Sequence, residues 1–293
     1  MFRGSLVALV TPMLSDGAVD YASLKKVVEY QKQNGTDGLI IMGTTGEAAT
    51  IPFAEQLDVL RFVLDVNEGA MQIIAGNGSN STAEAVEKTK ALNELPIDGF
   101  LTVTPYYNKP TQQGMIAHFK AVAAATTKPV LLYNVPGRTG VDLKAPAVAE
   151  LAQVPNIVGI KEATGSMERL AELQAVCPAD FDLLSGDDAS AAEFLLRGGH
   201  GVISVTTNVA PAGMTAMIAA ARAGDRATTT AVDATLQGLH RDLFIESNPI
   251  PSKWALWRLG LMQTDAARLP LTSLEPIHHL AIEQALKQAN LLS

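Results

Sequence analysis

The chain has 293 residues, of which 47% are hydrophobic and 18% are charged, a composition that excludes a disordered chain and allows a large core in one or two domains. Its formal net charge of −8 excludes the general positive charge of a protein that binds nucleic acid or an anionic membrane, so we expect neither partner. A small anionic substrate is not excluded, because a few local Lys or Arg side chains can bind a carboxylate in an acidic protein.

Eight short apolar runs with turn residues at their ends follow one another along the chain, in most cases about 30 residues apart. Continuous apolar runs are typical of strands that are covered on both faces. The runs are SLVALVTP, GLIIMG, QIIAGN, FLTVTP, PVLLYNVP, IVGIKEA, DLLSGD and GVISVT. Eight such strands predict an α/β fold with a closed parallel barrel, the (β/α)8 or TIM barrel.

The segments between these runs have the spacing of amphipathic helices. In the first segment Leu24, Val27, Val28 and Gln31 share one face, and Gly35 ends the pattern. The predicted helices span residues 21–33, 54–66, 82–95, 115–126, 145–152, 167–176 and 189–196. Regular alternation without a long linker predicts one barrel domain over residues 1–223.

After the eighth run the sequence has only helical patterns, from about residue 212 to residue 292. These patterns are interrupted at Gly224, Pro249, Pro251 and Pro270. Because a bare barrel takes ~250 residues, the surplus is predicted to form a C-terminal helical extension over residues 224–293.

The alternative architecture is a doubly wound open sheet that binds a dinucleotide. The glycine turn at 76–81 follows a predicted strand, and Asp98 lies about 20 residues further on. However, Ser81 replaces the third glycine of that fingerprint, and Asp98 precedes its strand, whereas the fingerprint needs the acidic residue at the carboxyl end of a strand. The pattern therefore disfavours a dinucleotide cofactor.

Cys177 is the only cysteine, which excludes an intramolecular disulfide and a multi-cysteine metal site and favours a reducing, cytoplasmic compartment. The five His residues show no metal-ligand spacing. No uninterrupted apolar run is long enough for a membrane span. We therefore expect no bound metal and no membrane helix.

In a parallel barrel the chemistry gathers at the carboxyl ends of the strands. There Lys161 interrupts an apolar run, and period-two alternation puts it on one face with Ile157 and Gly159. If that face is the barrel interior, burial disfavours the ammonium, and the neutral amine is the form that attacks a carbonyl to make a Schiff base. The alternative is a lysine that reaches water or pairs with Glu162.

Tyr133 ends another predicted strand and can pass a proton if it bonds to a second hydroxyl. Thr44, Thr45 and Tyr107 follow other strands and offer such hydroxyls. The alternative is that Tyr133 only covers the core and that the threonines only cap strands.

Arg138 stands in the glycine-flanked loop GRTG, where its planar guanidinium suits a carboxylate; the alternative is a solvated loop arginine. Asp187 and Asp188 follow Gly186 and could suggest a metal site, but an aspartate before a helix is more often an N-cap.

Six motifs, spread over essentially the whole chain, resemble those of the dihydrodipicolinate synthase family. They are GTTGE at 43–47, VTPYYNKP at 103–110, LYNVPGRTG at 132–140, GIKEATG at 159–165, LLSGDD at 183–188 and NPIPSKWAL at 248–256. The resemblance implies a (β/α)8 barrel with appended C-terminal helices packed on it. It implies a lyase that condenses pyruvate with aspartate semialdehyde in the diaminopimelate route to lysine, through a lysine imine and without a metal or organic cofactor.

The same resemblance implies roles for individual residues. Lys161 would form the Schiff base, and Tyr133 would donate and accept the proton, relayed through Thr44 to Tyr107. Arg138 would bind the semialdehyde carboxylate, and the pyruvate pocket would be lined by Thr45 and by the main chains of Gly186 and Ile203. In the family the second tyrosine of the relay comes from a neighbouring subunit, so we expect a homo-oligomer, usually a tetramer built as a dimer of dimers.

Lysine-inhibited members of the family bind lysine with residues that correspond here to Ala49, Asn80, Glu84 and Tyr106. They also use a serine and two basic or His positions, where this chain has Ala48, Phe53 and Gln56. Because these polar partners are partly lost, we expect this allosteric site to be degenerate and inhibition by lysine to be weak or absent.

Two other functions fit the fold. Another pyruvate-dependent aldolase, such as N-acetylneuraminate lyase, would share Lys161 and Tyr133, but such lyases generally lack the arginine found at Arg138. A non-catalytic ligand-binding barrel would predict a damaged site, whereas the residues of the relay are all in place. The condensing enzyme is therefore favoured over both.

Overall fold

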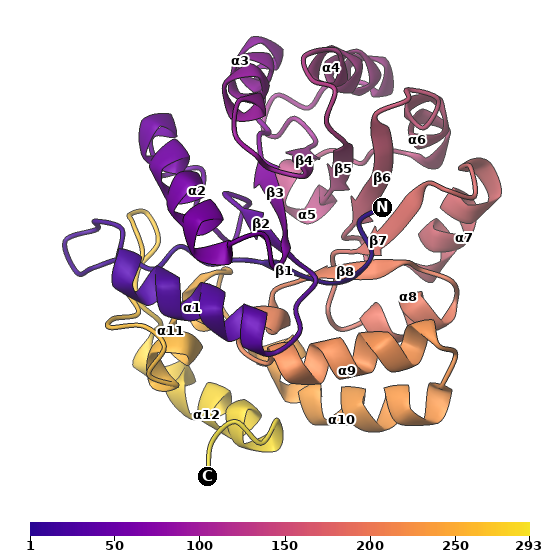
Figure 1. Cartoon of the computed structure of the whole chain (residues 1–293). Coiled ribbons are helices and arrows are strands. Elements are labelled where there is room, and N and C mark those ends of the chain that lie inside the picture. The colour runs from indigo at the N-terminus through magenta and orange to yellow at the C-terminus, as the bar shows by residue number, and fades with distance from the viewer.

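The computed structural model describes all residues from Met1 to Ser293, and its centre is a closed barrel of eight parallel strands in chain order (Figure 1). The strands are β1 (Gly4–Ala8), β2 (Gly38–Ile41), β3 (Gln72–Gly76), β4 (Gly99–Val103), β5 (Val130–Asn134), β6 (Ile157–Glu162), β7 (Asp182–Ser185) and β8 (Gly201–Ser204). β8 pairs with β1 and closes the ring. The predicted (β/α)8 barrel is confirmed, and the open sheet with its dinucleotide turn is excluded.

Helices surround the barrel and connect its strands (Figure 1). They are α1 (Tyr21–Gln33), α2 (Phe53–Asn67), α3 (Thr82–Asn93), α4 (Gln112–Ala124), α5 (Pro136–Thr139), α6 (Ala145–Leu151), α7 (Met167–Val176) and α8 (Ala191–Leu196). The predicted bounds of α1 and α7 are correct, and most of the others shift by one to three residues. The one-turn helix α5 was not predicted, because its sequence PGRT has two turn residues and no periodicity.

Side chains at the N-termini explain where several helices begin. In each case the residue before the helix has a side-chain oxygen that accepts a hydrogen bond from the N–H three residues later, which satisfies a donor that the first turn leaves free. These capping residues are Asp20 of α1, Ser81 of α3, Thr111 of α4 and Ser166 of α7.

Side chains of the strands alternate between the two sides of the barrel wall. The inner set, which fills the barrel, includes Leu6, Ile40, Ile74, Leu101, Leu131, Tyr133, Leu184 and Ile203. The outer set, such as Val7, Leu39 and Ile73, packs beneath the helices in a larger core. Because both sides of the wall are covered, the strands are continuous apolar runs in the sequence.

The strand β6 departs from the expected alternation. Val130 of β5 pairs with Ile157 and Leu131 pairs with Gly159, so Val158 is an additional residue in the ladder. Ile157 belongs to the outer core, whereas Val158 contacts the inner one. The prediction that Ile157 shares a face with Lys161 is therefore wrong, because the bulge lies between them.

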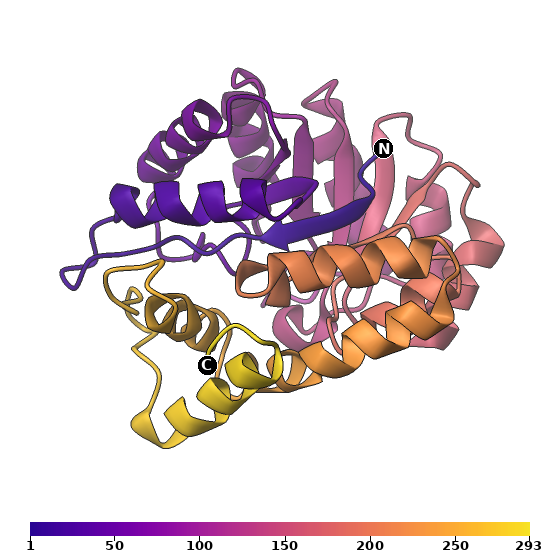
Figure 2. The ribbon, with the colours of Figure 1, turned by 60° about the horizontal axis from the view of Figure 1, so that its bottom comes forward.

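The last strand leads through a 3-10 turn, η1 (Thr206–Asn208), into α9 (Pro211–Arg222), and Gly224, with φ of +78°, follows two residues after this helix. The following helices are α10 (Arg226–Asp242), α11 (Ile250–Arg258) and α12 (His279–Gln288), with a 3-10 turn η2 (Pro276–His278) before α12. α10 packs along α9, and α12 packs on α10 and α11 (Figure 2).

The helical pattern predicted over residues 212–292, with an interruption at Pro270, does not form a helix anywhere from Leu259 to Glu275. Here Arg268 donates from its backbone to Glu47 and from its guanidinium to Gly17 and Glu55. The segment is therefore held by contacts with the barrel loops, and Pro270 could not have donated a helical hydrogen bond.

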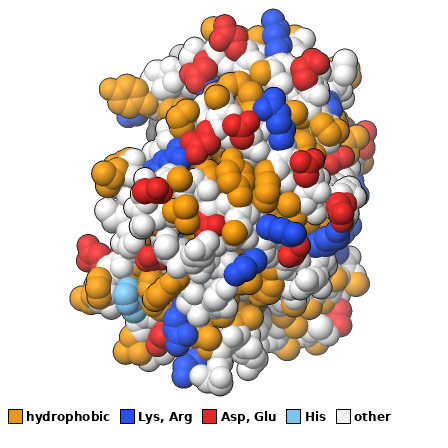
Figure 3. Space-filling view, turned by 60° about the vertical axis from the view of Figure 1, so that its left-hand side comes forward, with side chains coloured by type: hydrophobic (Ala, Val, Ile, Leu, Met, Phe, Trp, Pro, Cys, Tyr) orange, Lys and Arg blue, Asp and Glu red, His pale blue; other side chains and the backbone are white.

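The face that carries α1, α2, α11 and α12 shows positive and negative side chains interspersed among apolar ones (Figure 3). No broad area of one sign of charge appears on it. None of the helices has the length and hydropathy that a bilayer-spanning segment requires.

Candidate active site

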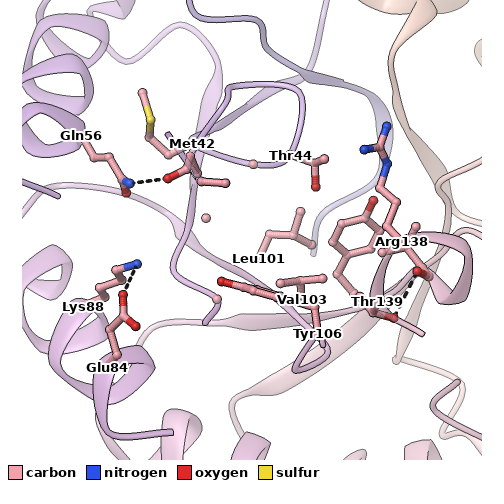
Figure 4. A pocket seen from close by; sticks show the side chains of 17 residues that line it. Met42, Thr44, Gln56, Glu84, Lys88, Leu101, Val103, Tyr106, Arg138 and Thr139 are labelled. Atoms are coloured by element: carbon pink, nitrogen blue, oxygen red, sulfur yellow. Dashed lines mark hydrogen bonds and ion pairs between the residues drawn. The ribbon is translucent and has the colours of Figure 1, made fainter. Parts of the chain in front are cut away.

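A cavity of about 380 Å³ opens beside the carboxyl ends of β2 to β5. Tyr133 is among the residues that line it, and in Figure 4 Thr44 and Arg138 lie at one end, with Gln56, Glu84 and Lys88 at the other. In Figure 4 the side chains of Leu101, Val103 and Tyr106 lie between these two ends. The carboxyl ends of the strands therefore hold a space of the size that a small substrate needs.

Lys161 extends into the barrel interior from β6 and is only 5% exposed. Its neighbour across the ladder is Tyr133 of β5, and its Nζ lies 4.4 Å from the centroid of the Tyr133 ring. Lys161 makes no ion pair. A buried amine that is not engaged by a carboxylate is available to attack the carbonyl carbon of a bound substrate.

Glu162, the next residue, points to the opposite side of the strand and has its own partners. Its carboxylate accepts hydrogen bonds from Asn134 Nδ2 at 3.0 Å, Thr164 N at 2.8 Å and Arg169 Nη1 at 3.4 Å. Burial raises the pKa of Glu162, although these donors oppose the effect. The alternative that Lys161 pairs with Glu162 is excluded, because the pleat separates the two side chains.

Behind this wall Arg169 also binds Asp142 through two hydrogen bonds of 2.9 Å. The guanidinium holds the pKa of Asp142 well below its usual range. Asn134 joins the two carboxylates, since its Nδ2 donates to Asp142 as well as to Glu162. This network fixes the ends of β5 and β6, from which Tyr133 and Lys161 extend.

Gly186, just after β7, allows the lysine side chain to occupy its position. A Cβ atom at residue 186 would lie 2.7 Å from Lys161 Cε and 2.8 Å from Ala163 Cβ. Ile203 of β8 belongs to the same inner cluster as Tyr133 and is buried. The structure thus brings Lys161, Tyr133, Gly186 and Ile203 together inside the barrel.

Tyr107 does not join them within one chain. It is 87% exposed, its φ is +74°, and only its backbone N–H is engaged, with Thr139 O at 3.3 Å. Its neighbour Tyr106 does line the cavity. A left-handed backbone is rare for a tyrosine, so the loop holds this ring outward at some cost in stability.

Arg138 lies on α5, so the prediction that it stands in a loop is corrected: Pro136 starts a single helical turn, and Gly140, at φ of +73°, ends it. Its guanidinium lines the cavity and donates to Asn248 O at 3.2 Å. Asn248 Nδ2 in turn donates to Thr45 Oγ1 at 2.8 Å. Sequence reasoning singled out the NPIPSKWAL motif but assigned no role to Asn248.

The two aspartates after Gly186 do not cap α8, which begins after Ser190 without a side-chain capping bond. Asp187 instead accepts from Ser190 in the preceding turn, and Asp188 accepts from the backbone of Val205 and Thr206. The N-cap expectation is therefore wrong for this helix, because Asp188 is used to fix the turn after β8. The structure groups no three His, Cys, Asp or Glu side chains in a metal-binding arrangement.

The cavity is lined by three of the four residues expected for a degenerate lysine site, namely Ala49, Glu84 and Tyr106. Asn80 does not line the cavity, and its carbonyl accepts from Asn108. Glu84 forms an ion pair of 2.8 Å with Lys88, and this bond together with Ser79 lowers the pKa of Glu84 (Figure 4). Sequence reasoning missed Lys88, although its i,i+4 spacing from Glu84 was a usable signal.

These features are those of the lysine-dependent (β/α)8 barrel lyases, in which a lysine inside the barrel forms an imine with a ketone substrate. The chain belongs to the dihydrodipicolinate synthetase family, whose sequence model matches residues 1–289.

Individual relatives agree with this placement. The 4-hydroxy-tetrahydrodipicolinate synthase of Methylococcus capsulatus is 54% identical over 292 residues, which is 100% of both chains. A crystal structure of the dihydrodipicolinate synthase of Acinetobacter baumannii, complexed with pyruvate, superposes with a TM-score of 0.97 at 47% identity over 100% of both chains. The enzyme of Cyanidioschyzon merolae with lysine bound gives a TM-score of 0.96 at 40% identity over 99% of both chains.

Proposed function

We propose that this chain is a 4-hydroxy-tetrahydrodipicolinate synthase, which condenses pyruvate with L-aspartate 4-semialdehyde on the route through diaminopimelate to L-lysine. Family membership over residues 1–289 supports the reaction. The observation in this chain that carries the proposal is Lys161, buried in the barrel, without a carboxylate partner and beside Tyr133.

In the proposed mechanism Lys161 Nζ attacks the ketone carbon of pyruvate, and the resulting carbinolamine loses water to give a protonated imine. The imine acidifies the methyl group, which loses a proton and becomes an enamine. The enamine carbon bonds to the aldehyde carbon of the semialdehyde, whose oxygen takes up a proton and becomes a hydroxyl. The substrate amine then attacks the imine carbon, closes the ring and releases Lys161.

The protonated imine accepts electrons twice, when the methyl group loses its proton to form the enamine and when the substrate amine attacks the imine carbon. The proposed reaction therefore needs no metal or organic cofactor. Tyr133 is the proposed proton donor and acceptor, because its ring lies against the lysine and also lines the cavity. Thr44 lines the same cavity and is the proposed next hydroxyl of the relay.

Tyr107 is the proposed last member of this relay, supplied by a second copy of the chain. Its exposed ring supports this role, since the ring makes no hydrogen bond within one chain and the left-handed backbone holds it outward. The proposal therefore includes a homo-oligomer, with a tetramer of two such pairs as the expected assembly.

The two substrate carboxylates are assigned to separate subsites. Thr45 and the main chains of Gly186 and Ile203 are proposed to bind pyruvate, and Arg138 is proposed to bind the semialdehyde carboxylate with its planar fork. The position of Arg138 on the cavity wall supports the second assignment.

Weak or absent inhibition by lysine is also part of the proposal. The side-chain amide of Gln56 donates hydrogen bonds to Ala48 O and Ile51 O, at 2.9 and 2.8 Å. The carboxylate of Glu84 already forms an ion pair with the ammonium of Lys88. Free lysine would have to compete with this internal cation for its acidic partner.

For the chain as a whole, we propose residues 1–223 as the catalytic barrel and residues 224–293 as its helical extension, with Gly224 at the boundary. The proposed compartment is the cytoplasm. The single, unpaired Cys177 supports it.

The test is borohydride reduction of the enzyme in the presence of pyruvate, followed by mass mapping and by an assay with aspartate semialdehyde. A reduced pyruvate adduct on Lys161 and turnover of the semialdehyde are expected. Absence of the adduct would overturn the mechanism, and an adduct without semialdehyde turnover would favour another pyruvate-dependent aldolase.

A further inference from the structure

Asn248 connects the two proposed substrate subsites and is itself 5% exposed. Its side-chain Nδ2 donates to Thr45 Oγ1 at 2.8 Å, and its backbone oxygen accepts from Arg138 Nη2 at 3.2 Å. The three residues come from the loop after β2, from α5 and from the extension just before α11. One asparagine therefore contacts both carboxylate-binding side chains.

The direction of the Thr45 bond is chemically important. A hydroxyl has one hydrogen to donate and two lone pairs to accept with. Because the Asn248 amide donates to Thr45 Oγ1, the hydroxyl hydrogen of Thr45 is left to donate to a substrate carboxylate. An acceptor in the place of this amide would take that hydrogen and leave the carboxylate without its donor.

The other atom of the same amide argues against a purely structural role. Asn248 Oδ1 is buried and has no hydrogen-bond partner. An unpaired buried acceptor lowers the stability of the fold. A residue with a purely structural role would therefore be expected to have hydrogen-bond partners for both its Oδ1 and its Nδ2 atoms.

A second contact fixes the distance between the extension and the loop of Thr45. Lys253, on the first turns of α11, forms an ion pair with Glu47, and both side chains are fully buried. Burial lowers the pKa of Lys253, while the Glu47 carboxylate opposes this effect. Glu47 lies two residues after Thr45, so the start of α11 is tied to this loop at two points.

We propose that Asn248 is a positioning residue that holds the Thr45 and Arg138 subsites at a fixed separation and keeps the Thr45 hydroxyl oriented as a donor to pyruvate. The proposal rests on the proposed function, in which these two side chains bind the two substrate carboxylates.

The test compares Asn248→Ala, the isosteric Asn248→Asp, Thr45→Val and the double variant Thr45→Val/Asn248→Ala in steady-state assays with both substrates. For Asn248→Ala the KM for pyruvate is expected to rise about 10- to 100-fold with a smaller rise for the semialdehyde and little change in kcat. Asn248→Asp is expected to raise the pyruvate KM at least as much, because its carboxylate accepts the Thr45 hydrogen.

The double variant separates positioning from structure. If Asn248 acts through Thr45, the double variant has the same pyruvate KM as Thr45→Val alone. Multiplied effects of the two substitutions, or an unchanged pyruvate KM in Asn248→Asp, would overturn the proposal. If Asn248→Ala does not fold, the Asn248→Asp result decides, since it keeps the shape of the side chain.

Asn67→Ala is the matched control. Asn67 is also buried, and both side-chain atoms bond to Met71 at the end of α2, away from the cavity. This variant is expected to lower thermal stability and leave both KM values unchanged. A wild-type enzyme that lacks the pyruvate adduct would contradict the proposed function; a wild type with the adduct and normal KM values in every Asn248 variant would contradict only the role of Asn248.

Discussion

Lys161 Nζ lies over the face of the Tyr133 ring, 4.4 Å from its centroid, on adjacent strands of the barrel wall. The negative face of the ring attracts an ammonium, and a neutral amine has the same size and fits against the ring in the same place. The ring and the hydroxyl of Tyr133 can therefore have separate roles, the ring packing the lysine and the hydroxyl moving protons.

Tyr133→Phe separates these two roles. It keeps the ring against Lys161, so the borohydride-trapped pyruvate adduct should still form, while kcat should fall about 10²- to 10⁴-fold because the proton donor is lost. Tyr30→Phe, which removes a hydroxyl that bonds only to Val209 O, is the control and should keep its activity. Equal loss of adduct and turnover in Tyr133→Phe would contradict the separation.

Gly186→Ala should displace the catalytic lysine. The new Cβ would lie 2.7 Å from Lys161 Cε, closer than carbon atoms pack, and Ala163 Cβ blocks a shift to the other side. We expect loss of the pyruvate adduct in mass mapping with only a modest change in thermal unfolding. Gly114→Ala on α4 introduces the same methyl group far from the lysine and should leave the adduct intact; full labelling of both variants would argue against the close packing.

Lys253→Met should destabilise the protein strongly, because it leaves the buried Glu47 carboxylate without its cation. Removal of one partner of a buried ion pair costs about 3–5 kcal/mol, whereas replacement of both partners is often nearly neutral. In urea unfolding we expect the double variant Glu47→Gln/Lys253→Met to recover much of the loss. Lys120→Met breaks an exposed pair with Glu150 and should cost at most about 1 kcal/mol.

His118 should make the protein less stable at mildly acidic pH. Burial on α4 lowers the pKa of His118 to about 4 from its ordinary 6.5, so between these values the unfolded chain binds a proton that the folded chain does not. Stability contributed by the neutral ring is complete above pH 6.5 and declines as the pH falls toward 4, by about 2 kcal/mol at pH 5. His118→Gln keeps a partner for Thr82 and should flatten this part of the urea-unfolding profile between pH 7 and 5; parallel profiles for the two proteins would contradict it.

Lys88→Met should increase the sensitivity to lysine. The substitution removes the internal cation from Glu84 and leaves a carboxylate at the far end of the cavity for a free ammonium group. Titration calorimetry should detect lysine binding to the variant and little or none to the wild type, and inhibition should follow the same order. Lys90→Met, on the exposed side of the same helix, is the control. Tight lysine binding by the wild type would refute both this prediction and the proposed insensitivity.

Hydrophobic patterning was sufficient to predict the barrel and most of its helices. The eight strands could be predicted because both sides of the wall are apolar, and helices such as α1 could be predicted because a single face is buried and a glycine ends the pattern. The one-turn helix α5 and the irregular stretch around Arg268 could not be predicted in this way. The sequence PGRT of α5 is too short to have a period, and the stretch around Arg268 depends on contacts with distant loops, which leave no periodic pattern in the sequence.

Within the candidate site, the strand-end rule found Lys161, Tyr133 and Thr44, because polar residues follow or interrupt apolar runs there, whereas Arg138 was found from its glycine-flanked motif GRTG. It placed Ile157 on the wrong face, since a bulge at Val158 has no signal in the alternation. The strand-end rule could not find Asn248, because this residue follows no strand and contacts Thr45 only because the extension folds back on the barrel. The opposite charges of Glu84 and Lys88, four residues apart, could have predicted their ion pair, but only the structure shows that the pair lines the cavity.

The contacts of the extension with Thr45, Glu47 and Arg138 bear on how this enzyme can be recombined with its relatives. A recombination point at Gly224 falls between two helices. It would nevertheless take Asn248 and Lys253 from a different parent than the loops that they contact. Chimaeras or gene-shuffling libraries should therefore inherit positions 45, 47, 138, 248 and 253 from one parent as a single block.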